Sequence, residues 1–287
     1  MYRFLFTPRW LGALALTLVA AAVMVMLGNW QLSRYRERAA INDRIDAAER
    51  VPPATLADVL PAAGSAPGTA GPSPASDDVW ARATATGRYD DANTALIRAR
   101  TVNGRVGFEV VTPLVLADGT AVLVDRGWVP PAAEGATAQP TVPAAPAGAV
   151  TVVGRVRLSE STAGAIDRRN GKIETRRIAV PQLAGALPYP AYGGYLLLDQ
   201  QTPPADPAFS AVPIRHENDW QNGGYVVQWW IFAGMALAGY GWLARREARA
   251  RTAGRGDERR SGGGDERRSD GRRSGDRPVA AEAPTAT

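Results

Sequence analysis

Two apolar stretches decide the fold: LGALALTLVAAAVMVMLGNW at residues 11–30 and YVVQWWIFAGMALAGYGWLA at residues 225–244. Each supplies the roughly 20 apolar helical residues that a bilayer core of about 30 Å requires. A soluble helix rarely stays apolar on every face for this length, because one face must meet water. We therefore predict two transmembrane α-helices, which place the residues between them on one side of a membrane and both chain ends on the other.

The first stretch has an alternative interpretation as a cleaved signal peptide. Signal sequences have apolar regions of about 7–15 residues that end at a cleavage site of small residues. This stretch is longer and leads into Gly28-Asn29-Trp30, which offers no such site. We favour an uncleaved anchor over a cleaved signal. Aromatic residues, which are typical of membrane interfaces, flank both stretches at Trp10, Trp30, Tyr225 and Trp242.

Arginine residues indicate the orientation, because positive flanks of transmembrane helices stay in the cytoplasm. Such flanks occur before the first stretch and after the second, at Arg3, Arg9, Arg245, Arg246, Arg249 and Arg251. Arg34, Arg36 and Arg38 give a contrary signal, but they begin a long domain, and long translocated domains largely escape the rule. We predict a multi-pass protein of a bacterial-type plasma membrane, with residues 1–10 and 245–287 cytoplasmic and residues 31–222 outside.

The composition excludes several kinds of site. The 287 residues include no cysteine, so disulfides, thiol nucleophiles and thiolate metal sites are excluded. Most of the net charge of +5 lies in the C-terminal tail, which repeats Gly, Ser, Asp and Arg. Such a segment buries too little apolar surface to fold. We expect the tail to be disordered from about residue 252 and to meet anionic lipid headgroups rather than nucleic acid.

The middle of the chain is predicted to be a β-rich domain of α+β class. Residues 31–50 continue the first helix until Val51-Pro52-Pro53, and residues 51–78 form a linker rich in Pro, Ala and Gly. Alternating apolar patterns predict strands at 79–89, 94–101, 108–116, 120–126, 150–158 and 194–199, and a short helical turn at 180–186. Asp118-Gly119 is a strong hairpin signal. We expect an antiparallel barrel or a sandwich-like module, and the pattern leaves both open.

Several different short motifs follow one another along the chain. The first stands at the exit of the first helix, four lie in the β-rich domain at 87–90, 107–114, 122–130 and 154–158, and the sixth opens the second helix. Among their residues are Gly28, Trp30, Gln31, Arg34, Pro113, Arg126, Gly127, Trp128, Tyr225, Gln228 and Trp229. In this order, and with two flanking helices, they resemble the Surfeit-locus protein one (Surf-one, Shy-one) family over about residues 9–245.

The resemblance implies a non-enzymatic assembly factor for haem–copper cytochrome c oxidase. Its implied partners are oxidase subunit I and other assembly factors, and its implied cofactor is a transiently bound haem a, passed to subunit I. The family carries a histidine three residues before Tyr225, where this chain has Asn222, and the only histidine is His216. His216 is a candidate axial ligand for haem, or else a solvated loop residue.

Arg126 is a second candidate cofactor-binding residue, because its planar guanidinium matches a haem propionate. The alternative for Arg126 is an ion pair at a strand end with Asp125 or another acid.

Two further classes of function stay open: an outward-facing membrane-anchored enzyme, and an anchored interaction or sensor domain without an oxidase role. The enzyme is disfavoured because the catalytic motifs of hydrolases and metalloproteases are missing, and a pair of Ser159 or Ser161 with Lys172 has no motif behind it. We expect no catalytic residue and no metal site.

Overall fold

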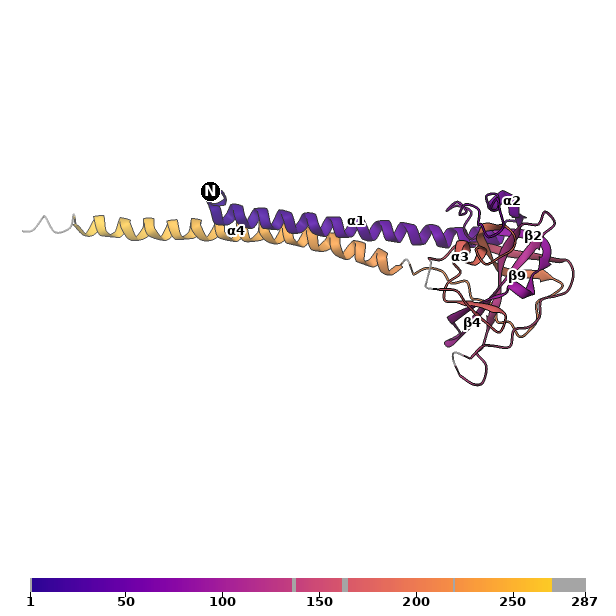
Figure 1. The fold of residues 1–287 in the computed structure, drawn as a ribbon. Coiled ribbons are helices and arrows are strands. Elements are labelled where there is room, and N and C mark those ends of the chain that lie inside the picture. Colours follow the sequence, from indigo (N-terminus) through magenta and orange to yellow (C-terminus); the bar gives the residue numbers. More distant parts are fainter. Residues whose placement is uncertain (1, 136–137, 162–164, 219, 270–287) are drawn as a thin grey trace, which may run out of the picture. The chain divides into compact units, whose positions relative to one another are not determined.

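The structure is a computed structural model that describes residues 2–135, 138–161, 165–218 and 220–269, without side chains for 254–269 (Figure 1). The chain divides into two compact units. One unit contains residues 1–36 and 219–287, and the other contains residues 37–218. The first unit is helical, and the second is built on a β-sheet.

Two long helices make up most of the helical unit. After a 3-10 turn, η1 (Arg3–Phe6), α1 runs over Pro8–Arg50, and α4 runs over Trp220–Ser269. Both contain a segment long and apolar enough to cross a membrane. They lie antiparallel, since the ring of Trp10 meets that of Tyr240 at 5.7 Å and Gly28 lies against Trp230.

The ends of both helices differ from the apolar stretches of the sequence. α1 continues through residues 31–50 and stops before Val51-Pro52-Pro53, as the proline pair predicts. α4 continues to Ser269 and so enters the segment expected to be disordered from about residue 252. No proline interrupts the sequence between residues 220 and 269, although the run Gly262-Gly263-Gly264 disfavours a helix. Residues 270–287 lie outside the described residues.

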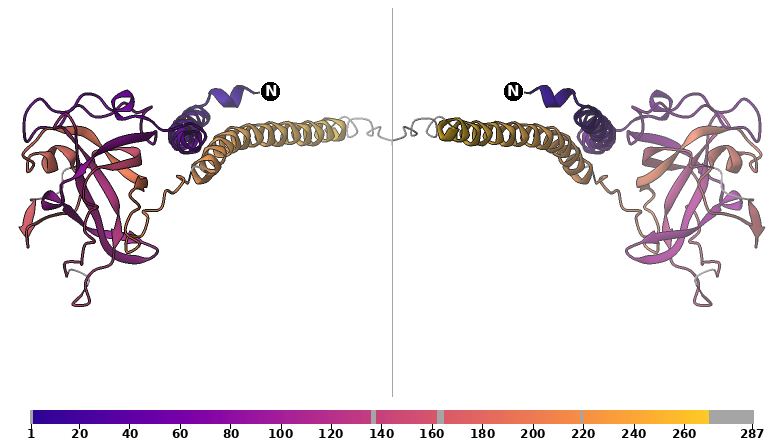
Figure 2. Two further views of the ribbon diagram at one scale, coloured as in Figure 1. Left: turned by 90° about the vertical axis from the view of Figure 1, so that its right-hand side faces the viewer. Right: turned by 90° about the vertical axis from the view of Figure 1, so that its left-hand side faces the viewer.

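The second unit is a sheet of nine described strands in the order β1-β2-β6-β9-β5-β4-β3-β8-β7. Their bounds are β1 Ala54–Thr55, β2 Arg82–Tyr89, β3 Ala95–Val102, β4 Arg105–Leu116, β5 Ala121–Val129, β6 Val150–Leu158, β7 Asp167–Arg169, β8 Lys172–Thr175 and β9 Ala191–Thr202. The strand β2 pairs with β4 as well as with β6, which closes β2, β6, β9, β5 and β4 into a barrel (Figure 2). Closure removes the exposed edges of these five strands.

The expectation of a purely antiparallel module is wrong, and of the two shapes left open the structure forms a barrel. Three pairs are parallel: β1 with β2, β3 with β8, and β5 with β9. Parallel neighbours require a long connection, here the stretch that carries α3 (Val180–Ala184) between β5 and β9. The hairpin at Asp118-Gly119 is confirmed, with Gly119 at a φ of +82° and its N–H donating to the Leu116 carbonyl at 3.1 Å. The segment expected to be a linker contains β1 and α2 (Leu56–Val59), which are too short to show a period.

Of three apolar clusters among the described residues, the two largest lie inside the barrel and under α3. The first draws side chains from all five closed strands and therefore fills the interior, with Leu114, Val122, Val152 and Leu196 among its fully buried members. The second packs α3 against the outer face of β4, β5 and β9. Each fully buried Val, Leu or Ile side chain contributes about 1.5–3 kcal/mol of transfer free energy. The closed barrel and its outer layer therefore form a rigid scaffold for the residues on β5.

The end of α1 belongs to the same unit and is anchored on β6. Ile45 is 2% exposed, and Arg155 of β6 is 4% exposed beneath the helix. The Arg155 guanidinium donates to the Ile45 carbonyl at 3.4 Å and to Glu49 Oε1 at 3.2 Å. A buried arginine that meets a helix carbonyl and a carboxylate in this way fixes the helix end on the barrel.

Candidate functional site

The motif Asp125-Arg126-Gly127-Trp128 lies at the end of β5, and all four residues are buried. Side chains of a strand point to opposite faces in turn. Asp125 therefore faces the side of the sheet that α3 covers, while Arg126 faces the other side. The two residues that are adjacent in sequence take part in two different clusters.

Arg126 is stacked between two aromatic rings. Its guanidinium carbon lies 5.2 Å from the ring centre of Tyr89 and 4.7 Å from that of Phe209. Its two terminal nitrogens donate to the carbonyls of Pro143 and Ala144 at 3.4 and 3.2 Å. The side chain is only 2% exposed, and burial lowers the pKa of Arg126. Cation–π contacts of this kind contribute about 0.5–2 kcal/mol each, more when desolvated.

The nearest carboxylate to Arg126 is that of Asp91, at 4.0 Å. The expected alternative for Arg126 was an ion pair with Asp125 or another acid. Asp125 instead accepts the Gly127 N–H at 3.1 Å. The guanidinium is thus held mainly by rings and backbone carbonyls, which leave little of it accessible to a propionate.

Asp125 belongs to a cluster of acids and arginines on the other face. Arg100 of β3 forms an ion pair with Glu109 of β4 at 3.0 Å and donates to Glu160, after β6, at 2.7 Å. Burial raises the pKa of Asp125 well above its usual range, and the Glu109 carboxylate raises it further. Burial also raises the pKa of Glu109, with Arg100 opposing the change and Glu160 adding to it. Crowded buried carboxyl groups of this kind favour keeping a proton among them.

Two residues in strained backbone conformations flank this acid–arginine cluster. Ala99 has a φ of +62° at the bulge that precedes Arg100, and Trp80 has a φ of +78°. The Trp80 ring lies 3.7 Å from the guanidinium carbon of Arg157, which hydrogen-bonds Tyr195. Burial raises the pKa of Tyr195 to about 12, although Arg157 opposes the change. Positive φ at non-glycine residues is costly and persists only where the surroundings enforce it.

Gly127 and Trp128 shape the end of β5. Gly127 has a φ of +130°, which side chains rarely adopt, and lies against Ser210 and Phe209. The Trp128 indole N–H donates to the Arg100 carbonyl at 3.0 Å. Trp128 also packs against Gly107, where any Cβ would collide with its ring. Trp128 thus holds the backbone of Arg100 in place through this hydrogen bond. We interpret Trp128 as a structural support for the acid–arginine cluster.

His216 lies in the segment that leads toward α4 and is tied to the outer turns of α1. Its Nε2 is 2.8 Å from Asp46 Oδ1, and its side chain is 55% exposed. The Asn42 amide bonds both backbone groups of Glu217, and Arg38 donates to the Asn218 carbonyl at 2.8 Å. One imidazole nitrogen of His216 is therefore already engaged by Asp46, and the side chain lies on the exposed surface of the sheet unit.

Some motif residues of the helical unit contact other side chains, and others are exposed or half-buried. Gly28 makes room for Trp230, because a Cβ there would lie 2.5 Å from the indole nitrogen. Trp229 meets Phe232 edge-on at 6.2 Å, and Arg34 lies over the ring of Trp30. Exposed or half-buried positions are taken by Gln31, Tyr225 and Gln228. In the sheet unit, Pro113 is buried in β4 and accepts the Asp90 N–H at 2.8 Å.

Asn222 stands where the resemblance would place a histidine. Its amide nitrogen is buried and has no hydrogen-bond partner among the described residues. An amide does not bind iron as an imidazole does, so this position does not fit a haem ligand of the usual kind. With Arg126 enclosed as well, the described residues do not fit a complete haem site, and we assign no step to haem.

Sequence reasoning missed most of the acid–arginine cluster. Glu109, Arg100, Glu160 and Trp80 come from four segments that are joined only by the closed sheet. Arg100 was part of a predicted strand, but the bulge at Ala99 that aims it at Glu109 leaves no period in the sequence. A charged residue inside the apolar run FEVVTPLVL, Glu109, was the one available signal.

Comparison with known proteins matches the model of the SURF1 family to residues 18–234. SURF1-like proteins of Mycobacterium bovis and Mycobacterium tuberculosis are 33% identical over 252 residues, which cover 86% of this chain and 88% of the relative. A SURF1-like protein of Dictyostelium discoideum is 40% identical over 42 residues, or 15% of this chain and 16% of the relative. The family match begins in α1 and ends in α4, and so includes the whole sheet unit.

Proposed function

The chain belongs to the SURF1 family, and from that premise we propose that it assists the assembly of haem–copper cytochrome c oxidase as a non-enzymatic membrane protein. Oxidase assembly is the role for which the family is known in general. The observation that carries the proposal is the extent of the match, because it runs from within α1 to within α4 and includes the closed barrel between them.

We propose that α1 and α4 each cross the membrane, with the chain ends in the cytoplasm and the barrel outside. The exposure of their apolar side chains supports this proposal, since Leu16 is 72% and Met26 71% exposed on α1. Only 11% of the most apolar window of each helix is buried within the protein. Surfaces of this kind are stable in lipid and costly in water.

The partners that we propose are oxidase subunit I and other assembly factors. The geometry favours binding over catalysis, because the charged groups at the end of β5 are paired and enclosed rather than open to a substrate. Aid in haem a insertion is a finer proposal. It is tested by titrating haem into the purified full-length chain and its His216→Ala variant, with the absorbance of bound haem as the readout.

The second candidate function is an anchored interaction or sensor domain without an oxidase role. A deletion strain separates the two, when complemented by the full chain or by a chain that ends at residue 251. An assembly factor restores cytochrome c oxidase activity in both forms, while other respiratory complexes stay constant. A sensor that signals through its tail works only as the full chain, and its loss leaves the oxidase intact.

A further inference from the structure

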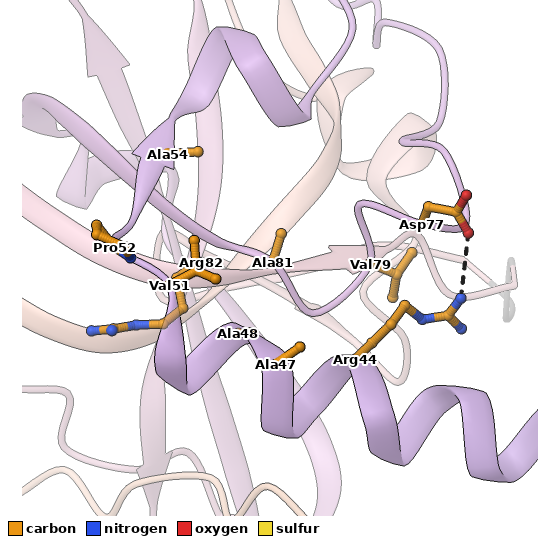
Figure 3. Close-up of a pocket in the computed structure, with 10 residues that line it drawn as sticks. All are labelled: Arg44, Ala47, Ala48, Val51, Pro52, Ala54, Asp77, Val79, Ala81 and Arg82. Carbon is orange, nitrogen blue, oxygen red and sulfur yellow. Dashed lines mark ion pairs between the residues drawn. The ribbon is translucent and has the colours of Figure 1, made fainter.

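A groove lies between the end of α1 and the segment that enters β2 (Figure 3). Its volume is about 220 Å³. The apolar side chains that line it are mostly alanines: Ala47, Ala48, Val51, Ala54, Val79 and Ala81. Val51 is 59% exposed at its edge. The small residues leave space that larger apolar side chains would fill, so an apolar surface faces solvent beside a well-packed barrel.

The size of the groove restricts its occupant. Pockets for cofactors and drug-sized ligands measure about 300–1,000 Å³, so this groove is too small for such a ligand. It suits one large apolar side chain. Single anchoring side chains that fill pockets are typical of the centres of protein–protein interfaces.

The charges at the rim specify what stands next to that side chain. Arg44 lies 3.6 Å from Asp77, which is 94% exposed, and Figure 3 shows its guanidinium turned toward that carboxylate. Arg82, the other arginine of the groove, lies closer to its partner Asp199, at 3.2 Å, and that carboxylate is only 31% exposed. Arg44 therefore has the longer and more solvated ion pair of the two, and a better-placed carboxylate would compete with Asp77 for it.

We infer that this groove docks a protein segment that carries a large apolar side chain next to an aspartate or glutamate. The apolar side chain fills the alanine-lined space, and the carboxylate binds Arg44 in place of Asp77. The inference rests on the proposed function in one respect, since it assigns the segment to a protein that takes part in oxidase assembly. It thereby gives the sheet unit a defined binding surface that none of the family motif residues lines.

The first test uses matched variants of the full chain in the deletion strain. Ala47→Trp fills the groove from an exposed position, and Ala40→Trp places the same side chain at an exposed position of α1 that does not line it. Arg44→Glu repels the carboxylate, and Arg44→Lys keeps the charge. We expect Ala47→Trp and Arg44→Glu to lower oxidase activity about tenfold at an unchanged amount of chain, as loss of a central anchor does. Ala40→Trp and Arg44→Lys should keep most of it.

These outcomes separate the inference from the proposed function. If the wild-type chain does not restore the oxidase, the proposed function fails. If the wild-type chain restores it and Ala47→Trp does so equally well, the groove assignment is overturned.

A second measurement decides the case in which a variant chain fails to accumulate. A photo-crosslinking residue replaces Val51 at the groove edge in the full chain in its membranes, and the crosslinked peptide is sequenced. We expect a segment with a large apolar residue beside an acid, lost in Ala47→Trp and kept in Ala40→Trp. Adducts with lipid alone, or with a second copy of this chain, would contradict the inference, as would an adduct that Ala47→Trp leaves unchanged.

Discussion

At the scale of single residues, two buried charged groups at the end of β5 carry a large cost of desolvation. Asp125 is 2% exposed and accepts a backbone N–H, and the raising effect of burial and Glu109 on its pKa outweighs the lowering effect of Arg100. Arg126 next to it is enclosed by rings. Removing a carboxyl group and a guanidinium from water costs free energy, and here the two groups lie on opposite faces of one strand end. The two residues therefore make separate and testable contributions to stability.

Asp125 makes stability depend on pH in a defined direction. Its folded pKa is raised by burial, so between the unfolded pKa of about 3.9 and the folded value the native state holds the extra proton. The free energy of unfolding thus falls as the pH rises through this window. In Asp125→Asn this contribution is absent. We expect its stability relative to wild type to increase with pH, measured by hydrogen exchange of β5 amides in the full-length protein.

Asp90 supplies a control of the opposite sign. Burial would raise its pKa, but hydrogen bonds from Asn93 and Tyr189 outweigh burial and lower it. Its contribution is present above the unfolded pKa and is lost as the pH falls, so Asp90→Asn should lose stability relative to wild type as the pH rises. A difference between Asp125→Asn and wild type that is the same at every pH would refute the assignment of a raised pKa.

Arg126 is expected to stabilise the barrel by shape as well as by charge. Arg126→Lys keeps the charge but loses the flat stack between Tyr89 and Phe209, at a cost of about 1–2 kcal/mol in the free energy of unfolding. Arg126→Met should cost more, because the carbonyls of Pro143 and Ala144 lose their donors. Denaturant unfolding of the full chain measures both. If Arg126→Lys has the same free energy of unfolding as wild type, only the charge matters and the stack has no effect.

At the scale of elements, the contact between α1 and α4 depends on a glycine. A Cβ at Gly28 would meet the Trp230 indole, whereas a Cβ at Gly12 of the same helix meets nothing within 4 Å. We expect Gly28→Leu to separate the helices and lower the thermal stability of the detergent-solubilised protein, and Gly12→Leu to leave it unchanged. Equal behaviour of the two variants would show that the helices do not pack through this position. A Cβ at Gly234 or Gly241 of α4 would also meet nothing within 4 Å.

Strands that are long enough to show an alternating apolar pattern could be predicted from the sequence, and shorter ones could not. The strands expected at 150–158 and 108–116 and the turn at Asp118-Gly119 appeared because alternation and turn chemistry are local. β7 and β8 have three and four residues, too few to show a period. Closure of β2 on β4 and the parallel pair of β5 with β9 join distant segments, so local pattern does not contain them. The same holds for the acid–arginine cluster, which exists only once these strands meet.

At the scale of the whole molecule, the proposed topology places the barrel and the chain end on opposite sides of a membrane. The chain has no cysteine, so single cysteines report their own positions. We expect a membrane-impermeant maleimide to label Ala117→Cys, in the exposed β4–β5 hairpin, in intact cells. It should not label Ala250→Cys, an exposed position of α4, until the cells are opened. Labelling of both in intact cells would rule out the proposed topology.

The oxidase role of the whole molecule is tested most directly by one ratio. Cytochrome c oxidase activity is divided by the activity of an unrelated respiratory complex in membranes of the deletion strain, before and after the full chain is restored. We predict a ratio that falls on deletion and returns with the chain, together with the haem a absorbance. A ratio that is the same in the presence and absence of the chain would contradict an assembly function.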